Sequence, residues 1–367
     1  MMSAVVKAQI DLSALTHNVL RIKQLAPKSR ILAMIKANGY GHGVKNVAQT
    51  LSLLVDGLGV ARLSEAVMLH EAGIRTPIFI MDGFFSRDEL DEAMKDHFIA
   101  VLNNETQINM IEKAQTSDSL KVWIKINTGM NRLGFAPEAL PAIYKRLSNC
   151  PSILQPPGLM THFACADLKA HPLNQAQIDC FDKTVAAYPG EKSLDNSAAL
   201  LNFPNTHADW VRPGIMLYGA SPIATQTGLE LGLKPVMTLK SELIAINQVK
   251  AGDAVGYGSL YVCDKPTRIG VVAIGYGDGY PRHRQNGTPV LIHDRVAPIV
   301  GCVSMDMLTV DLNDHPESKI GDDVILWGKG LPAEVIAKQA ETIAYELFCQ
   351  VNQTQDRVEY IYTNSLL

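Results

Sequence analysis

The feature that most constrains the fold is a repeated alternation of short apolar runs with helical patterns between residues 31 and 217. Each run has the length of a buried strand, and the segments between the runs carry apolar residues at three- and four-residue steps. This alternation is typical of βα units around a parallel sheet. We therefore expect eight strands, at residues 31–35, 57–61, 77–81, 99–102, 122–126, 158–161, 192–194 and 215–217.

A helix is expected before the first of these strands, because apolar residues repeat helically from Leu12 to Ile22 behind a possible cap, Asp11 or Ser13. Eight βα units fit a closed barrel, and an open doubly wound sheet has a similar local pattern. After about Leu233 the pattern changes to alternating strands and turns, with a short helix expected at 333–338. The 367 residues therefore predict two domains, an α/β domain at 1–233 and a mostly β domain at 234–367.

Composition excludes several classes of function. A formal net charge of -4 offers no basic surface for nucleic acid. The apolar runs are too short to cross a membrane, and the N-terminus has no apolar stretch of a secretion signal, so we expect a cytoplasmic protein. The six cysteines are scattered without zinc spacing, which indicates reduced thiols rather than disulfides or metal ligands.

A lysine follows the strand expected at 31–35 and opens a glycine-rich loop from Lys36 to Gly43. A lysine at the C-terminal end of a barrel strand faces the region where barrel enzymes have their active sites. Its amine can bond to an aldehyde cofactor if its neighbours leave it partly neutral. Taken alone, such a lysine is more often a solvated strand end.

Two further groups suit an anionic ligand. Arg132 follows the strand expected at 122–126, and its planar guanidinium matches a substrate carboxylate, although a surface ion pair is the ordinary alternative. The Ser197 hydroxyl and the amides of Gly214 and Ile215 lie beside the last expected strands, where barrel enzymes commonly bind phosphate.

These segments together resemble alanine racemases. The loop from Lys36 to Gly43 is similar to the cofactor-lysine signature of that family, and the segment from Lys125 to Gly134 is similar to its arginine signature. Segments around His162, Asn196 and Arg212 follow in the family's order, and the resemblance extends from about Gln9 to Trp327. It implies an N-terminal (β/α)8 TIM-like barrel that binds pyridoxal 5′-phosphate, followed by the mostly β domain.

The resemblance also implies roles for single residues. Lys36 carries the cofactor and is one catalytic base, Arg132 binds the substrate carboxylate, and Lys125 is carbamylated in many relatives, where it holds that arginine. Arg212 faces the pyridine nitrogen, which stays unprotonated beside a permanent cation, so that the ring is a weaker electron sink and racemisation is favoured over transamination. The implied cofactor contacts are Lys36, Tyr40, His162, Asn196, Ser197, Arg212, Gly214 and Ile215.

In the β domain the resemblance implies that Tyr257 is the second base, that the Met305 amide meets the substrate carboxylate, and that Tyr276 lines the entrance. A free phenol has a pKa of about 10, so a base at this position needs positive neighbours, for which His162 and Arg212 are the obvious sources. The family's tyrosine comes from the other subunit, which implies a head-to-tail homodimer with shared sites.

The implied activity is the interconversion of L- and D-alanine, which supplies D-alanine for peptidoglycan. Lys36 and Tyr257 act on opposite faces of the substrate carbon. The alternatives are a serine or broad-specificity racemase of the same fold, a barrel-type decarboxylase, a non-catalytic pyridoxal-phosphate carrier and a structural barrel. Asp356 stands where many relatives carry a phosphate-binding tyrosine, so we expect no phosphate contact there.

Overall fold

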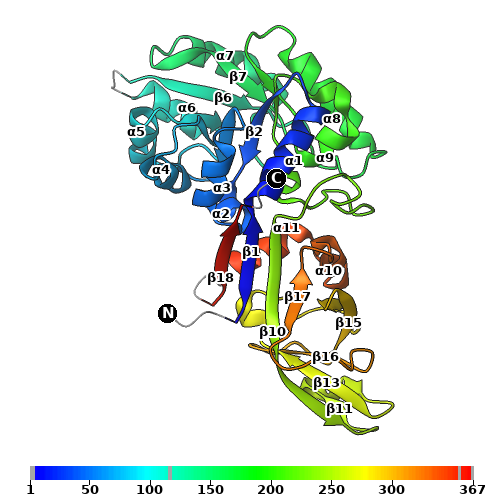
Figure 1. Cartoon of the computed structure of the whole chain (residues 1–367). Coiled ribbons are helices and arrows are strands. Elements are labelled where there is room, and N and C mark those ends of the chain that lie inside the picture. The colour runs from blue at the N-terminus through cyan, green and yellow to red at the C-terminus, as the bar shows by residue number, and fades with distance from the viewer. Residues whose placement is uncertain (1–4, 115–117, 354–356, 365–367) are drawn as a thin grey trace.

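The computed structural model describes residues 5–114, 118–353 and 357–364, so that Asp356 lies outside the described residues. The chain forms two bodies, a parallel barrel with its surrounding helices and a second, mostly antiparallel β domain (Figure 1). The predicted fold class is confirmed in both parts. In the described part of the chain no helix is both long and apolar enough to cross a membrane, and all six cysteines are free thiols.

The barrel is a parallel sheet with the strand order β8-β7-β6-β5-β4-β3-β2-β9 in the described residues. Its strands are almost wholly buried because helices cover the outside of the sheet, which explains why they appear in the sequence as continuous apolar runs. All the predicted strands except the last are confirmed to within a few residues. The strands are β2 Arg30–Met34, β3 Gly57–Val60, β4 Ile78–Ile80, β5 Ile99–Leu102, β6 Leu120–Lys125, β7 Ile153–Met160, β8 Lys192–Ser193 and β9 Trp210–Val211.

The eighth strand lies a few residues before the predicted position. The prediction of a strand at 215–217 is wrong, because this apolar run forms a buried 3-10 helix, η3 (Ile215–Tyr218). The strand that pairs with β2 is β9, with Trp210 opposite Arg30. Main-chain bonds from Asp209 N to Lys192 O (3.1 Å) and from Arg212 N to Asp195 O (2.9 Å) bring β9 beside β8. A short apolar run reports burial but does not distinguish a strand from a buried helix.

Helix α1 (Leu12–Leu25) begins where the sequence predicted, with Asp11 as its cap. The Asp11 Oδ1 atom accepts hydrogen bonds from the amides of Ser13 and Ala14 at 2.9 Å and 3.1 Å. The remaining helical segments of the barrel are α2 Lys36–Tyr40, α3 Val44–Leu51, α4 Leu63–Glu71, α5 Arg87–Lys95, α6 Glu105–Glu112, η1 Pro137–Ala139, α7 Leu140–Ser148, α8 Pro172–Val185, α9 Ser197–Asn202 and η2 Pro204–Thr206.

The second sheet includes the N-terminal strand of the chain. Strand β1 (Lys7–Asp11) pairs antiparallel with β10 (Met237–Val249) and parallel with β18 (Glu359–Thr363), so the first residues of the predicted barrel domain belong to the other sheet. The boundary between residues 233 and 234 stays a prediction. The other strands and helical segments are β11 Ala254–Val255, η4 Tyr257–Ser259, β12 Tyr261–Val262, β13 Thr267–Val272, η5 Tyr276–Asp278, β14 Pro289–Ile292, β15 Arg295–Val300, β16 Leu308–Asp311, β17 Asp323–Trp327, α10 Ala333–Gln339 and α11 Ala344–Gln353.

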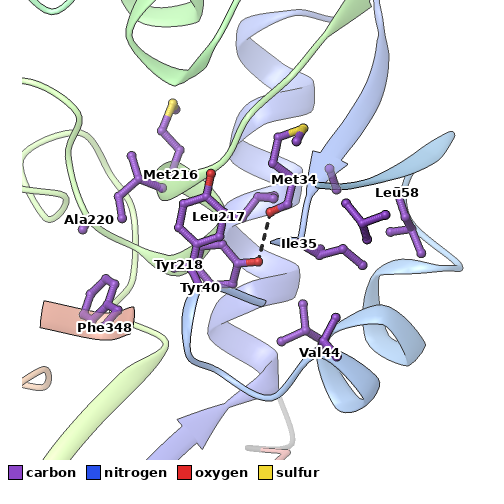
Figure 2. Close-up of a cluster of buried hydrophobic side chains, with 14 of the residues drawn as sticks. Met34, Ile35, Tyr40, Val44, Leu58, Met216, Leu217, Tyr218, Ala220 and Phe348 are labelled. Carbon is purple, nitrogen blue, oxygen red and sulfur yellow. Dashed lines mark hydrogen bonds between the residues drawn. The ribbon is translucent and has the colours of Figure 1, made fainter. Parts of the chain in front are cut away.

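Helix α10 confirms the helix predicted at 333–338. Helix α11 joins the two bodies, because its Phe348 packs edge-on against His42 of the lysine loop, with ring centroids 5.0 Å apart. Figure 2 shows Phe348 on the same side of this cluster as Ala220 and Tyr218. Helix α11 of the same chain therefore packs against the lysine loop.

Candidate active site

Lys36 lies immediately beyond strand β2, at the start of an unusual left-handed turn. Ala37, Asn38 and Gly39 have φ values of 53°, 53° and 63° with ψ near those of a left-handed helix, and the turn ends at Gly41. For a residue with a side chain this conformation costs about 1–2 kcal/mol. Such a turn persists only where its surroundings hold it, and it presents the partly exposed Lys36 at the barrel mouth.

Two polar side chains hold the left-handed turn. Asn38 Oδ1 accepts a hydrogen bond from Val44 N (2.8 Å). Glu65, at the start of α4, accepts from Ala37 N through Oε1 (2.8 Å) and from Ala61 N through Oε2 (2.8 Å). The carboxylate thus ties the lysine loop to the end of the neighbouring strand β3. Sequence reasoning missed Glu65, although an acidic residue in the first turn of a predicted helix is a recognisable capping signal.

Tyr40, Ser197 and Gly214 meet at one side of the mouth. The Tyr40 ring stacks on Tyr218, with ring centroids 4.8 Å apart and an interplanar angle of 23°, and Figure 2 shows the two rings together beside Met34. A Cβ atom added to Gly214 would lie 2.4 Å from the Tyr40 hydroxyl. Gly214 N donates to Ser197 Oγ (2.8 Å), and Ser197 keeps its own O–H as a donor. Burial raises the pKa of Tyr40, so its hydroxyl stays protonated.

Asn196 and Ile215 flank this group. Asn196 caps α9, because its Oδ1 atom accepts from Ala198 N (3.1 Å) and Ala199 N (3.0 Å). Ile215 is fully buried and opens η3 directly after Gly214. The structure therefore places both residues beside Ser197 and Gly214, and their predicted contact with a cofactor stays a prediction.

Arg212 is buried behind the mouth, immediately after β9, and its guanidinium is held from several sides. Nη1 donates to Ser193 Oγ (2.6 Å), and Nη2 donates to the carbonyl oxygens of Thr161 (2.6 Å) and Leu194 (3.0 Å). Burial lowers the pKa of Arg212 to about 10, while Asp195 opposes that shift, so the group is charged at neutral pH. Sequence reasoning missed Ser193 and Asp195, for which it has no local signal.

His162 lies beside Arg212 as predicted, with its Nδ1 atom 3.2 Å from Arg212 Nη2. Its pKa is lowered well below the ordinary value by burial and by the positive charges of Arg212, Lys125, Arg132 and Lys36. His162 is therefore neutral, so the prediction that it supplies positive charge to Tyr257 is wrong, and Arg212 is the remaining source. Because Arg212 can only donate, Nδ1 is the acceptor and the proton of the neutral ring lies on Nε2.

Four basic side chains, Lys36, Lys125, Arg132 and Arg212, share this site. The pKa of Lys125, at the end of β6, is lowered to about 8 by burial and then by Arg212, Arg132 and Lys36, with Asp82 opposing. Arg132 is exposed on a turn whose amides, Gly129 N (3.2 Å) and Asn131 N (2.9 Å), donate to Asn127 Oδ1. So many like charges in one mouth raise the affinity for anions such as phosphate and carboxylate.

Within one chain, the structure does not bring Tyr257 to this mouth. Tyr257 opens η4 directly after β11, and Figure 1 places β11 at the end of the β domain opposite the barrel. Its side chain is 71% exposed, and Met305 and Tyr276 are 53% and 40% exposed. The predicted site residues of the barrel domain therefore lie at the barrel mouth of one chain. The predicted site residues of the β domain are exposed on its surface.

Comparison with known proteins agrees with this division. The family model described as alanine racemase, N-terminal domain, matches residues 10–222, and the model described as alanine racemase, C-terminal domain, matches residues 236–362. Together these models cover most of the chain.

Curated relatives match along nearly the full length. The alanine racemase of Shewanella sediminis (strain HAW-EB3) is 48% identical over 341 residues, which cover 93% of this chain and 95% of that protein. The alanine racemase of Coxiella burnetii (strain RSA 331 / Henzerling II) is 47% identical over 359 residues, covering 96% and 98%.

Solved structures show the same fold. The crystal structure of the biosynthetic alanine racemase from Pseudomonas aeruginosa superposes with a TM-score of 0.95 at 41% identity, covering 99% of this chain and 100% of that chain. The alanine racemase from Acinetobacter baumannii has a TM-score of 0.92 at 40% identity, covering 98% and 100%. With both family models and such relatives in agreement, this chain belongs to the alanine racemase family.

Proposed function

We propose that this chain interconverts L- and D-alanine with pyridoxal 5′-phosphate bound through Lys36. The observation that carries the proposal is the group of four basic side chains, Lys36, Lys125, Arg132 and Arg212, around a neutral histidine at one barrel mouth. A substrate carboxylate and a phosphorylated cofactor are the anions that this group of charges suits. Membership of the alanine racemase family supports the same activity over the alternatives with another substrate or no chemistry.

The residues at the mouth fit that cofactor. Gly214 leaves room where a Cβ atom would collide with the Tyr40 hydroxyl, and the amide and hydroxyl groups around it suit a phosphate. Tyr40, Ser197 and the segment of Gly214 and Ile215 would hold the phosphate, Lys36 the aldehyde carbon and Arg212 the ring nitrogen. When bound, pyridoxal phosphate supplies an electron sink that lowers the cost of negative charge on the substrate α-carbon.

The chain's own residues then bind the substrate and move the proton. Arg132 holds the substrate carboxylate in a two-point contact, and the Met305 amide meets the same group. Lys36 Nζ takes the α-proton of one enantiomer, and the Tyr257 oxygen takes that of the other from the opposite face. Two bases on opposite faces are required, because a single base would return the proton to the side from which it came.

Arg212 and His162 set the charge around the reacting centre. Arg212 is anchored by Ser193 and by the carbonyls of Thr161 and Leu194, so its charge stays in place during the proton transfers. A permanent cation keeps the ring nitrogen unprotonated, which limits charge delocalisation and disfavours transamination. His162 keeps Nε2–H as a donor toward the site, because Nδ1 already accepts from Arg212.

The active unit is a head-to-tail homodimer in this proposal. Tyr257 follows β11, which lies at the end of the β domain opposite the barrel (Figure 1), and its side chain is 71% exposed, so in this proposal a second copy brings it to Lys36. Other large apolar side chains of the β domain are also exposed, which indicates a surface that a partner covers; they are Leu260, Val262, Tyr276, Met305 and Met307. A two-fold axis then builds two equal sites.

The activity is tested by chiral separation of products after incubation of the cofactor-loaded protein with L-alanine. We expect D-alanine from the wild type and none from Lys36→Ala. If the loaded wild type produces no D-alanine, the proposed function is refuted. Parallel incubation with L-serine measures substrate preference, and we expect alanine to react faster.

The shared site is tested by mixing two inactive variants, Lys36→Ala and Tyr257→Phe. Subunit exchange creates mixed dimers in which one of the two sites has both bases, so we expect activity to return toward a quarter of the wild type, because roughly half of the dimers are mixed. If mixing restores nothing although mass spectrometry detects mixed dimers, the two bases do not come from different copies.

We place this activity in the cytoplasm, because six free cysteines suit a reducing compartment. Its role in supplying D-alanine for peptidoglycan is a prediction from the family resemblance. A metabolic label that follows D-alanine into the cell wall of a strain lacking this protein would test that role.

A further inference from the structure

Arg357 lies at a junction that the proposed mechanism does not use. It precedes strand β18, and its Nε atom donates to Asp278 Oδ1 at 2.8 Å, while Nη2 donates to Asp306. Asp278 belongs to η5, which carries Tyr276, and Asp306 directly follows Met305. One guanidinium thus links the two loops that carry the predicted entrance and substrate-contact residues.

The two loops are also joined directly through their main chains. Tyr276 N donates to Ser304 O (3.1 Å), and Gly277 N donates to Met305 O (2.8 Å). A Cβ atom added to Gly277 would lie 2.6 Å from Arg357 Nη1 and 3.0 Å from Met305 O. The guanidinium therefore lies against the main chain at the point where the two loops meet, and no side chain fits between them.

Asp278 is the buried partner in this link. Its carboxylate is 3% exposed and accepts from Gly275 N through Oδ2 (2.9 Å), which fixes the start of η5. Burial raises the pKa of Asp278, and the hydrogen bond and charge of Arg357 oppose that shift. An ion pair between exposed groups contributes little to stability. Removing the cation beside a buried carboxylate costs much more, because the negative charge is left buried without a partner.

We propose that Arg357 is a positioning residue that locks the loops of Tyr276 and Met305 together and so sets the place of the Met305 amide at the substrate carboxylate. The inference rests on the proposed function for its kinetic consequence. The lock itself is a property of the fold and is measurable without turnover.

Loss of the lock should change substrate binding more than the chemical step. In the cofactor-loaded dimer, Arg357→Ala should raise KM for L-alanine roughly tenfold, the equivalent of one weakened charged contact, with a much smaller change in kcat. Arg357→Lys should recover part of the loss, because an ammonium keeps the charge but cannot reach both carboxylates in fork geometry. Asp306→Asn, which weakens one arm, should have a smaller effect than Arg357→Ala.

Arg295 provides a matched control in the same domain. It is also half-exposed, and its Nη1 atom donates to Glu317 at 2.7 Å, but it lies on β15 outside both loops. Arg295→Ala should cost a similar or smaller amount of thermal stability and leave KM unchanged. If Arg295→Ala raises KM as much as Arg357→Ala does, the effect is general loosening and the inference is overturned.

Amide hydrogen exchange measures the lock directly. We expect faster exchange at the amides of Tyr276 and Gly277 in Arg357→Ala than in the wild type, with strand β13 unchanged. Unchanged exchange and unchanged KM overturn the inference even if the melting temperature falls. Should Arg357→Ala fail to fold, Arg357→Lys and Asp306→Asn give the same two readouts. A wild type without racemase activity refutes the proposed function, while hydrogen exchange still decides whether the lock exists.

Discussion

Substitution of Gly214 by alanine tests the pocket assigned to the cofactor phosphate. An alanine Cβ at this position would lie 2.4 Å from the Tyr40 hydroxyl oxygen and 3.1 Å from Cζ, and non-bonded heavy atoms essentially never lie within 3.0 Å of a Cβ atom in proteins. Tyr40 cannot turn away easily, because its ring is buried and stacked on Tyr218. Either the Tyr40 hydroxyl or the main chain at Gly214 has to move.

The size of the effect follows from this overlap. Overpacking of a well-packed site costs about 1–3 kcal/mol. In the Gly214→Ala apoprotein the Tyr40 hydroxyl can move away from the new Cβ atom. Phosphate binding requires the hydroxyl in its original place, so the cost of the overlap then reduces the binding free energy. We therefore expect the affinity for pyridoxal phosphate to fall by roughly tenfold to hundredfold.

A double-mutant cycle with Tyr40→Phe isolates the contact. The phenylalanine lacks the hydroxyl, so the nearest atom to the new Cβ would be Cζ at 3.1 Å and the added cost of Gly214→Ala should largely disappear. Titration of the apoprotein with pyridoxal phosphate, followed by absorbance, gives the four affinities. Equal losses with and without the Tyr40 hydroxyl, or no loss in Gly214→Ala itself, would refute the explanation.

Three further outcomes are expected from the site. Burial and nearby cations lower the pKa of Lys125 to about 8, which leaves part of the amine neutral near pH 7, so isotopically labelled bicarbonate should give a carbamate resonance that grows between pH 6 and pH 8 and is absent from Lys125→Met. Glu65→Ala and Glu89→Ala should both lower stability by about 1 kcal/mol, because each removes an acceptor at a helix start, but only Glu65→Ala should also weaken cofactor binding, since Glu89 bonds Phe85 N and not the lysine loop. Burial raises the pKa of Asp195 from 3.8 to about 6, so the folded state holds this proton longer and stability should fall as pH rises through that interval; the fall should disappear in Asp195→Asn when unfolding is followed against pH, and a persisting fall would exclude Asp195 as its source.

The strands and the principal site residues could be predicted because their signals are local. A buried parallel strand appears as a short apolar run, and the residues that follow it face the barrel mouth by construction. The run before Lys36 and the run before Arg132 are of this kind, and both residues lie where the sequence placed them. The family signature in the lysine loop then indicated a lysine that binds pyridoxal phosphate, and it could be recognised because its residues are consecutive in the chain.

Contacts between distant segments could not be predicted in this way. The anchors of Arg212 include Ser193 and the carbonyls of Thr161 and Leu194, which are ordinary residues until the barrel closes. The eighth strand was predicted at 215–217, because the buried helix η3 is as apolar as a strand. Periodicity reports how deeply a segment is buried, whereas its partner depends on the packing of the whole chain.

By itself the sequence determined the type of fold, the order of the elements and the set of residues that carry charge to the mouth, because these depend on local patterns of hydrophobicity and on consecutive motifs. Only the tertiary structure decided that the first strand joins the second sheet, that four basic side chains share one site with a neutral histidine, and that β11, which precedes Tyr257, lies at the end of the β domain opposite the barrel. The physical reason is that charge clusters, shifted pKa values and exposed faces arise from distances between residues that are far apart in the chain.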